Sequence, residues 1–364
     1  MTSRTLNLSN YRLAICLGPG GVGKTTFSAA LALDNALHGR DVDVMTIDPA
    51  PRLIDALGLG HDATELKPVD LPHAGAKSAG SLRAMRLDSK KTFDQLIERH
   101  APSSAVRDAI MSGRIYQNLS NALAGVADYM AMERLLELYK ENALGLIVLD
   151  TPPAEDALEF LDAPRRMVEL VGSRAITLLS SSRSIFRTPS AMIDMAARAV
   201  LGAFDRITGL HLLSDVREFV TNFEGMYEGF AQRASEVRSL LYDPKTLVVL
   251  VTTTEQERIE QVCGFGEALR SMKISIGAVI INRMMRPLPE GREIDEIRLP
   301  AALKKKLHRN LADFTALKAR ETDALKVLRN ALGENTRFFG SDDCGGEPRA
   351  LSDFAKLAKD LHPL

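Results

Sequence analysis

The sequence predicts an α/β fold: a mostly parallel sheet with helices on both faces and a helical subdomain inserted into it. Two observations predict this fold. Short apolar runs typical of buried parallel strands alternate with stretches whose apolar residues recur at helical spacing. The first run also ends in a glycine-rich loop, and a helical pattern follows that loop over residues 25–38. The runs that we interpret as strands are residues 11–17, 42–47, 82–87, 144–149, 246–251 and 276–281.

One long interval breaks this alternation. Between about residue 90 and residue 241 only the run 144–149 is typical of a strand, and the rest is helical in pattern, including 126–140 and 189–204. We therefore expect one domain over residues 1–364 that carries two helical insertions, 90–143 and 155–241. Segments rich in proline, glycine and charge predict surface loops. They are residues 62–81, 286–300 and 341–349.

Composition excludes some classes of protein. The 364 residues hold 46 Lys and Arg against 47 Asp and Glu, so no bulk attraction to nucleic acid or membrane is expected, and no stable DNA binding. No run of about eighteen apolar residues occurs, which predicts no transmembrane segment. The first ten residues lack the apolar core of a signal peptide. A cytoplasmic location is expected, with any membrane contact peripheral.

The three cysteines also favour a cytoplasmic location. Cys16, Cys263 and Cys344 are far apart and form no CxxC pair. This spacing argues against a disulfide framework and a thiolate zinc site, and it fits a reducing compartment. We expect all three to be small buried apolar side chains.

A phosphate-binding loop follows the first apolar run. Residues 18–25 read Gly-Pro-Gly-Gly-Val-Gly-Lys-Thr, which fits the pattern G-x-x-x-x-G-K-[ST]. Glycines allow backbone N–H groups to converge on phosphate oxygens, and the next helix adds the partial positive charge of its N-terminus. In this pattern Lys24 reaches the β and γ phosphates, and Thr25 ligates Mg²⁺. The sequence therefore predicts a P-loop that binds ATP and Mg²⁺.

Two aspartates end predicted strands. Asp48 follows the run 42–47, and Asp150 follows the run 144–149. Ligands bind at the carboxyl ends of parallel strands, and P-loop enzymes need an acidic residue there to hold the water shell of the metal. Asp150 is the candidate for that role, acting through water. Either aspartate could instead cap a helix or a turn, and the residues alone leave this alternative open.

Three stretches together resemble one family. They are residues 20–26 (GGVGKTT), 48–55 (DPAPRLID) and 150–158 (DTPPAEDAL). This combination resembles the ArsA-type anion-transporting ATPases, which include the ATPases that target tail-anchored membrane proteins and belong to the MinD/ParA class of P-loop proteins. Residues 124–133, 252–253 and 281–283 agree with the same family. The resemblance covers nearly the whole chain.

The resemblance implies a role for each matching position. Asp48 would stand in the first switch and orient the attacking water, with Lys24 as the second catalytic residue. Asp150 would open the second switch as the Mg²⁺-linked acid. Asn282 would hydrogen-bond adenine, since an amide offers both a donor and an acceptor. The implied nucleotide-binding residues are Gly20, Gly21, Val22, Gly23, Lys24, Thr25, Thr26 and Asn282.

Several positions depart from the family pattern. Members usually carry a lysine directly before Gly20, and that lysine crosses a dimer to the partner's phosphates. Here the residue is Pro19, which has neither charge nor backbone donor. Pro51 replaces the usual histidine of the first switch, and residues 154–156 (AED) replace Thr-Gly-His in the second. The family's zinc CxxC and arsenite-binding cysteines are missing, so arsenite binding is not predicted.

Two hypotheses explain how the site is completed without that lysine. Family members work as dimers with ATP near the shared face, so a homodimer or a heterodimer is implied. In the heterodimer a paralogue with the usual lysine completes this site. In the other solution Arg52, four residues after Asp48, supplies the charge. The sequence leaves both open.

Three functions fit these features. The first is a dimeric switch ATPase that couples its nucleotide state to a protein or hydrophobic client. The second is a MinD/ParA-type positioning scaffold, which is weaker because residues 351–364 are mixed in charge. The third is a metabolic ligase or reductase of the same class. One segment offers features for a partner, although a solvated helix face is the favoured explanation of its basic residues and core packing that of its apolar residues. These are the basic residues Arg165, Arg166, Arg174, Arg183, Arg187 and Arg198 and the apolar residues Met192, Met195, Ala196, Val200, Leu201 and Phe204.

Overall fold

The protein divides into two compact units, each with its own core. The structure is a computed structural model, and it describes residues 6–71, 80–113, 116, 124–171, 221–346 and 348–364. One unit, here called the sheet unit, comprises Met1–Arg86, Glu141–Leu158 and Tyr242–Leu364. The other, here called the helical unit, comprises Leu87–Lys140 and Glu159–Leu241.

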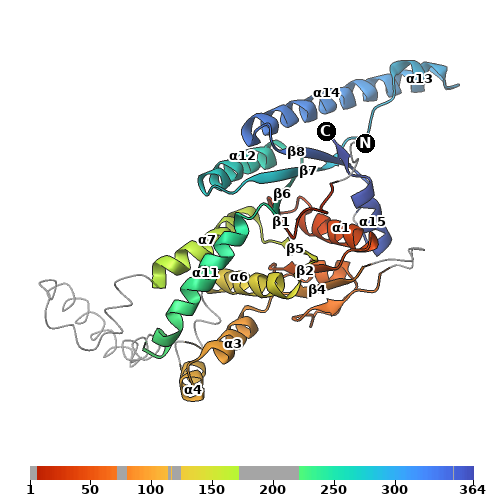
Figure 1. Cartoon of the computed structure of the whole chain (residues 1–364). Helices are drawn as coiled ribbons and strands as arrows, with labels where there is room; N and C mark the ends of the chain where they lie inside the picture. Colours follow the sequence, from red (N-terminus) through yellow and green to blue (C-terminus); the bar gives the residue numbers. More distant parts are fainter. Residues whose placement is uncertain (1–5, 72–79, 114–115, 117–123, 172–220, 347) are drawn as a thin grey trace, which may run out of the picture. The chain divides into compact units, whose positions relative to one another are not determined.

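A nine-stranded sheet forms the centre of the sheet unit (Figure 1). Its strand order is β3-β4-β2-β5-β1-β6-β7-β8-β9. Every pairing is parallel except those of the edge strands β3 and β9. The predicted fold class is therefore confirmed. The strands are β1 (Leu13–Leu17), β2 (Val42–Thr46), β3 (Lys67–Pro68), β4 (Leu82–Arg86), β5 (Leu146–Asp150), β6 (Thr246–Thr252), β7 (Ile276–Met284), β8 (Arg337–Asp342) and β9 (His362–Pro363).

Strand β1 lies in the middle of the sheet because it is apolar on both faces. Side chains alternate along a strand, so Leu13 and Ile15 point opposite to Ala14 and Cys16. All four are completely buried. The face of Ala14 and Cys16 packs in a cluster with α1 (Lys24–Leu37) and α15 (Leu351–Lys359). The remaining helices of the sheet unit are α2 (Arg52–Ala56), α12 (Gln256–Ser271), α13 (Gly291–Glu296) and α14 (Ala301–Leu332).

Some elements differ from the expectation. β3 lies inside the expected loop 62–81, and α13 lies inside the expected loop 286–300. β8 and β9 were not predicted. The expected helix 189–204 falls outside the described residues, as do Arg174 to Arg198 of the basic stretch and the whole apolar stripe that begins at Met192. No helix in the described part of the chain is long and apolar enough to cross a membrane.

The described residues of the helical unit form helices and no strand. They are α3 (Ser89–His100), α4 (Ser104–Ser112), α6 (Ala124–Glu141), α7 (Ala154–Val171), the short 3₁₀ helix η1 (Glu224–Met226) and α11 (Tyr227–Leu241), with α6 and α7 each reaching into the sheet unit. An aromatic and aliphatic cluster fills their interior, and it includes Phe93, Tyr116, Tyr129, Phe223 and Phe230. Phe223 and Phe230 lie with ring centroids 5.5 Å apart.

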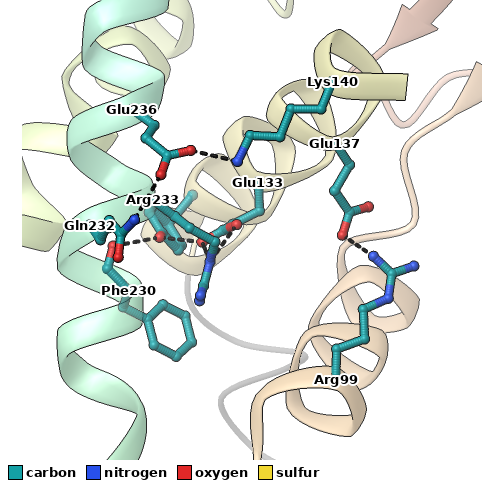
Figure 2. Close-up of polar contacts among 9 residues, drawn as sticks. Arg99, Glu133, Glu137, Lys140, Phe230, Gln232, Arg233 and Glu236 are labelled. Carbon is teal, nitrogen blue, oxygen red and sulfur yellow. Dashed lines mark hydrogen bonds and ion pairs between the residues drawn. The ribbon is translucent and has the colours of Figure 1, made fainter. Parts of the chain in front are cut away.

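A buried ion pair joins α6 to α11 in this unit. Figure 2 shows Arg233 of α11 directed at Glu133 of α6, and its Nε lies 2.9 and 3.0 Å from the two carboxylate oxygens. The Glu133 side chain is only 2 % exposed. Tyr129 donates a hydrogen bond to the same carboxylate, and the Arg233 guanidinium stacks on Phe230. Burial raises the pKa of Glu133, while the charge of Arg233 and the Tyr129 hydrogen bond oppose that rise.

Arg233→Met should therefore destabilise the protein in a pH-dependent way. Removal of one partner leaves a buried charge uncompensated, which costs about 3–5 kcal/mol. The pKa of Glu133 then rises further, so a larger fraction of Glu133 is protonated in the folded variant at low pH, and less stability is lost at pH 5 than at pH 8. The loss develops as the pH rises from the usual carboxyl pKa through the raised one. Urea unfolding at pH 5 and pH 8 measures both quantities.

Two further variants test the cause of that loss. Arg238→Met removes an exposed arginine of the same helix and should change stability little. Glu133→Leu added to Arg233→Met should recover most of the loss, since apolar replacement of a buried pair is often neutral. Tyr129 then keeps the Phe230 carbonyl as its acceptor at 3.2 Å. An equal loss at both pH values would show that packing, and not the charge of Glu133, is responsible.

Candidate nucleotide site

The loop between β1 and α1 has the backbone that a phosphate cradle needs. Gly18 has φ +147°, and a Cβ there would lie 2.1 Å from the Val251 carbonyl oxygen, so only glycine allows this approach to β6. Gly23 has φ +102° and is the N-cap of α1, where no side chain caps the helix. A Cβ added at Gly20 or Gly21 would meet nothing within 4 Å. The first-turn N–H groups of α1 thus face an open loop, which suits an anion.

Lys24 lies across this loop. Its Nζ donates to the Pro19 carbonyl oxygen at 2.9 Å, and the residue is 8 % exposed. Burial lowers the pKa of Lys24, whereas the charges of Asp150 and Asp48 raise it and the charge of Arg52 lowers it. The ammonium group is therefore held inside the loop by a single carbonyl. Phosphate oxygens can take the place of that carbonyl.

Asp150, the last residue of β5, connects several elements. Thr25 and Thr46 donate hydrogen bonds to its Oδ2, each at 3.0 Å, and Ser28 donates to its Oδ1 at 3.2 Å. Asp150 is fully buried, and burial raises its pKa to about 6. The three hydroxyl groups and the charge of Lys24 oppose that rise. The expected partners Thr25 and Asp150 are thus brought together.

Asp48 lies just beyond the end of β2 and is half-buried. Its Oδ1 accepts a hydrogen bond from the Ala50 N–H at 2.9 Å, which shapes the turn before α2. Its own N–H donates to the Thr46 hydroxyl at 3.3 Å, and that hydroxyl donates to Asp150. One side chain, Thr46, therefore links the two strand-end aspartates.

Asn282 lies in β7 beside the P-loop. Its Nδ2 donates to the Val22 carbonyl oxygen at 2.8 Å, and its Oδ1 accepts from the Arg283 N–H at 2.8 Å. A Cβ on Gly23 would lie 2.6 Å from this Nδ2, so the contact with the loop also requires glycine there. In this structure Asn282 supports the loop backbone and keeps one N–H of its amide for another acceptor.

The residues present fit a magnesium ion that is held partly by phosphate. Mg²⁺ prefers oxygen ligands and is usually bound by one or two carboxylates together with substrate phosphates. Thr25 and Asp150 supply such oxygens at the mouth of the cradle. In the described part of the chain no group of three or more His, Cys, Asp or Glu could hold a metal by itself.

Three supporting residues were missed by the sequence analysis. Ser28 lies one helical turn after Lys24, Thr46 pairs with Asp150 in the sheet register, and Thr151 donates to the Cys16 carbonyl oxygen at 2.8 Å. The sequence signal for such residues is a hydroxyl side chain at a strand end or on the first turns of the helix that follows the P-loop. Cys16 is buried, and burial raises its thiol pKa to about 12. Cys344 is exposed, so the expectation that every cysteine is buried was wrong.

Comparison with known proteins decides the family. A sequence model of the anion-transporting ATPases matches residues 11–313. The chain belongs to this family. Similar relatives are "ATPase GET3" of Malassezia globosa, 26% identical over 318 residues that cover 85% of this chain and 84% of the relative, and "ATPase get3" of Aspergillus terreus, 28% identical over 306 residues that cover 83% and 81%. The resemblance in sequence is confirmed, and the chain is a nucleotide-binding ATPase.

As a member of this ATPase family, the chain has an unusual loop entry. A cavity of about 370 Å³ opens beside Pro19 and Gly20, and Pro153, Asp156 and residues of α12 complete its wall. None of its described lining residues is a lysine or an arginine, and Asp156 is exposed. With Pro19 at its edge, the hollow next to the cradle therefore has one acidic side chain and no basic one among its described lining residues.

Arg52 follows Asp48 by four residues. It is exposed and begins α2, directly after the turn that Asp48 shapes. Its charge is close enough to lower the pKa of Lys24.

Proposed function

We propose that this ATPase is a dimeric switch that couples its nucleotide state to binding of a protein or hydrophobic client. The observation that carries the proposal is the Asp150 carboxylate, which accepts hydrogen bonds from Thr25 and Ser28 on one helix and from Thr46 at the end of another strand. A change at the phosphate cradle alters these contacts. Thr46 passes the change to the backbone of Asp48 and so to α2. The first and second switches thus respond together.

Each site residue has a proposed task. Gly20, Gly21, Val22, Gly23 and Thr26 offer backbone N–H groups to the phosphates, and Lys24 leaves the Pro19 carbonyl to neutralise phosphate charge. Thr25 and Asp150, the latter through water, would hold Mg²⁺. The ion would supply neutralisation of the negative charge on the phosphates. Asp48 orients the attacking water, and Asn282 offers its remaining N–H to adenine.

The chain is proposed to act as one P-loop ATPase domain, residues 1–364, with helical insertions at 90–143 and 155–241. A client of hydrophobic character fits the family and a helical unit, and the dimer is a homodimer or a heterodimer. The packing of α15 argues against the scaffold alternative, because Phe354 and Leu357 of this helix are buried in the core with α1. The apolar face of α15 is therefore covered by the core and is not available to a membrane.

Steady-state ATP hydrolysis by the isolated chain tests the proposal. A charge opposite the γ phosphate is worth several orders of magnitude in related enzymes, and this chain has only Pro19 where the family has lysine. We expect slow hydrolysis that accelerates when a lysine-bearing paralogue is added. The hollow beside Pro19 and the exposed Asp156 favour a cation that a second protein chain supplies.

The variant Arg52→Ala tests the second hypothesis, in which Arg52 supplies the charge of the missing lysine. If Arg52 replaces the lysine, the isolated chain hydrolyses ATP readily and the variant loses about 100-fold in rate. Arg292→Ala, an exposed arginine of α13 in the same unit, is a matched control for charge. If the isolated chain hydrolyses ATP fast and Arg52→Ala is equally fast, both the heterodimer hypothesis and the Arg52 hypothesis are refuted. If no condition gives hydrolysis, the proposed switch ATPase is refuted.

A further inference from the structure

Exposed apolar side chains gather in the N-terminal half of α14. Of the eight large apolar residues that are markedly exposed in the described chain, four lie between positions 297 and 317. Leu303, Phe314 and Leu317 are 42, 48 and 46 % exposed, and Ile297 precedes the helix at 50 %. Single exposed apolar residues need no explanation, but a cluster on one helix does.

These residues form one stripe of the helix. Leu303 and Phe314 are eleven residues apart, which is three helical turns, and Leu317 follows one turn later. Continued at two-turn steps from Phe314, the same stripe reaches Glu321 and Leu328. Those two residues are buried. The stripe is therefore covered in the C-terminal half of α14 and open in the N-terminal half.

The packing of α14 explains this difference. α14 packs on α12 and on α13. Figure 1 shows α12 beside the C-terminal part of α14, whereas the N-terminal part extends beyond it with the short α13 at its end. All three helices belong to the sheet unit.

Basic residues flank the open stripe. Residues 297–320 contain seven Lys and Arg against a single acid, Asp313. Lys306, Arg309 and Arg320 lie along one edge of the stripe, whereas Lys305 lies on the opposite face of the helix. All four are exposed, and none of them forms an ion pair with another described residue. In α13, Asp295 is engaged by His308 at 2.8 Å, and the exposed Glu296 ends the helix. An exposed apolar stripe edged by unpaired cations is typical of a helix that lies in a membrane surface.

We propose that the N-terminal half of α14 docks on an anionic lipid surface. Phe314 and Leu317 enter the boundary between headgroups and acyl chains, and Lys306, Arg309 and Arg320 remain at the phosphates. A second copy of this chain suits the face less well, because it would place two strongly basic segments against each other. The docking surface is separate from the nucleotide site and does not depend on the function proposed above.

Flotation of the full-length protein with vesicles tests the proposal. The vesicles are phosphatidylcholine alone, or phosphatidylcholine with about a third phosphatidylserine. We expect binding to the anionic vesicles only, and weaker binding as salt is raised. The double change Phe314→Gln and Leu317→Gln should abolish binding. Lys306→Gln with Arg309→Gln should weaken it roughly twenty- to thirty-fold, at about five-fold for each charge.

Val327→Gln is the matched control. Val327 is 51 % exposed on the same helix but lies off the stripe. This variant should bind as the unchanged protein does, and thermal unfolding should be the same for all variants because every altered side chain is exposed. Equal binding to neutral vesicles, or no binding at all, overturns the proposal. Self-association that Phe314→Gln and Leu317→Gln abolish would instead assign the face to a second copy, and this too overturns it.

Discussion

Lys24→Ala should abolish ATP binding at concentrations where the unchanged protein is saturated. The ammonium group lies in the loop, 2.9 Å from the Pro19 carbonyl oxygen, and its charge is the one that the cradle offers to the β and γ phosphates. Charge-assisted hydrogen bonds contribute about 1.5–3 kcal/mol each. Loss of two such bonds predicts an affinity at least about 100-fold lower. Isothermal titration calorimetry with ATP and Mg²⁺ measures it.

A matched variant separates this effect from a general loss of positive charge. Lys67→Ala removes an ammonium group that pairs with Asp62 on the surface of the same unit. ATP affinity should be unchanged there. Because the Lys24 side chain is buried, the folded state of Lys24→Ala must be checked by circular dichroism. Nearly normal ATP affinity in a folded Lys24→Ala protein would mean that the loop binds phosphate through its backbone alone.

The P-loop and the strand-end aspartates could be predicted because local sequence determines them. A run such as residues 11–17 can be buried on both faces only in a covered parallel sheet, and its glycine-rich end must turn into the helix that follows. Once β2 and β5 are known to be parallel, Asp48 and Asp150 must lie at the same edge. The pairing of Thr46 with Asp150 then follows from the register of the two strands.

Other elements could not be predicted because tertiary contacts decide them. β8 has two phenylalanines and then Gly340, so its pattern is too short to distinguish it from a loop. It is a strand because β7 offers a parallel edge to it. α13 begins inside a proline-rich segment, where the capping interaction between Glu290 and Glu293 is the only local signal. The open stripe of α14 was missed for a related reason, since a periodic apolar pattern predicts a covered face and does not reveal where the cover ends.

Asp48→Asn should keep ATP binding and slow hydrolysis by about 100-fold or more. The amide has the shape of the carboxylate, and its oxygen can still accept the Ala50 N–H at 2.9 Å, so the turn before α2 is preserved. What is lost is the negative charge that, in the proposed mechanism, orients and polarises the attacking water. Since this interaction is formed in the transition state and not with ground-state phosphate, the rate constant falls and the affinity for ATP changes little.

Single-turnover hydrolysis and ATP titration on the same preparation separate the two quantities. Asp55→Asn, in α2 and on the surface, removes one carboxylate nearby and should leave both unchanged. Equal loss of ATP affinity in Asp48→Asn and Lys24→Ala would contradict the division of roles between these residues. If the division holds, Asp48→Asn keeps ATP bound without turnover. A client that binds the ATP state should then be retained by this variant and released by Lys24→Ala, because only the former holds Thr25, Asp150 and Thr46 in the arrangement that the triphosphate and its metal impose.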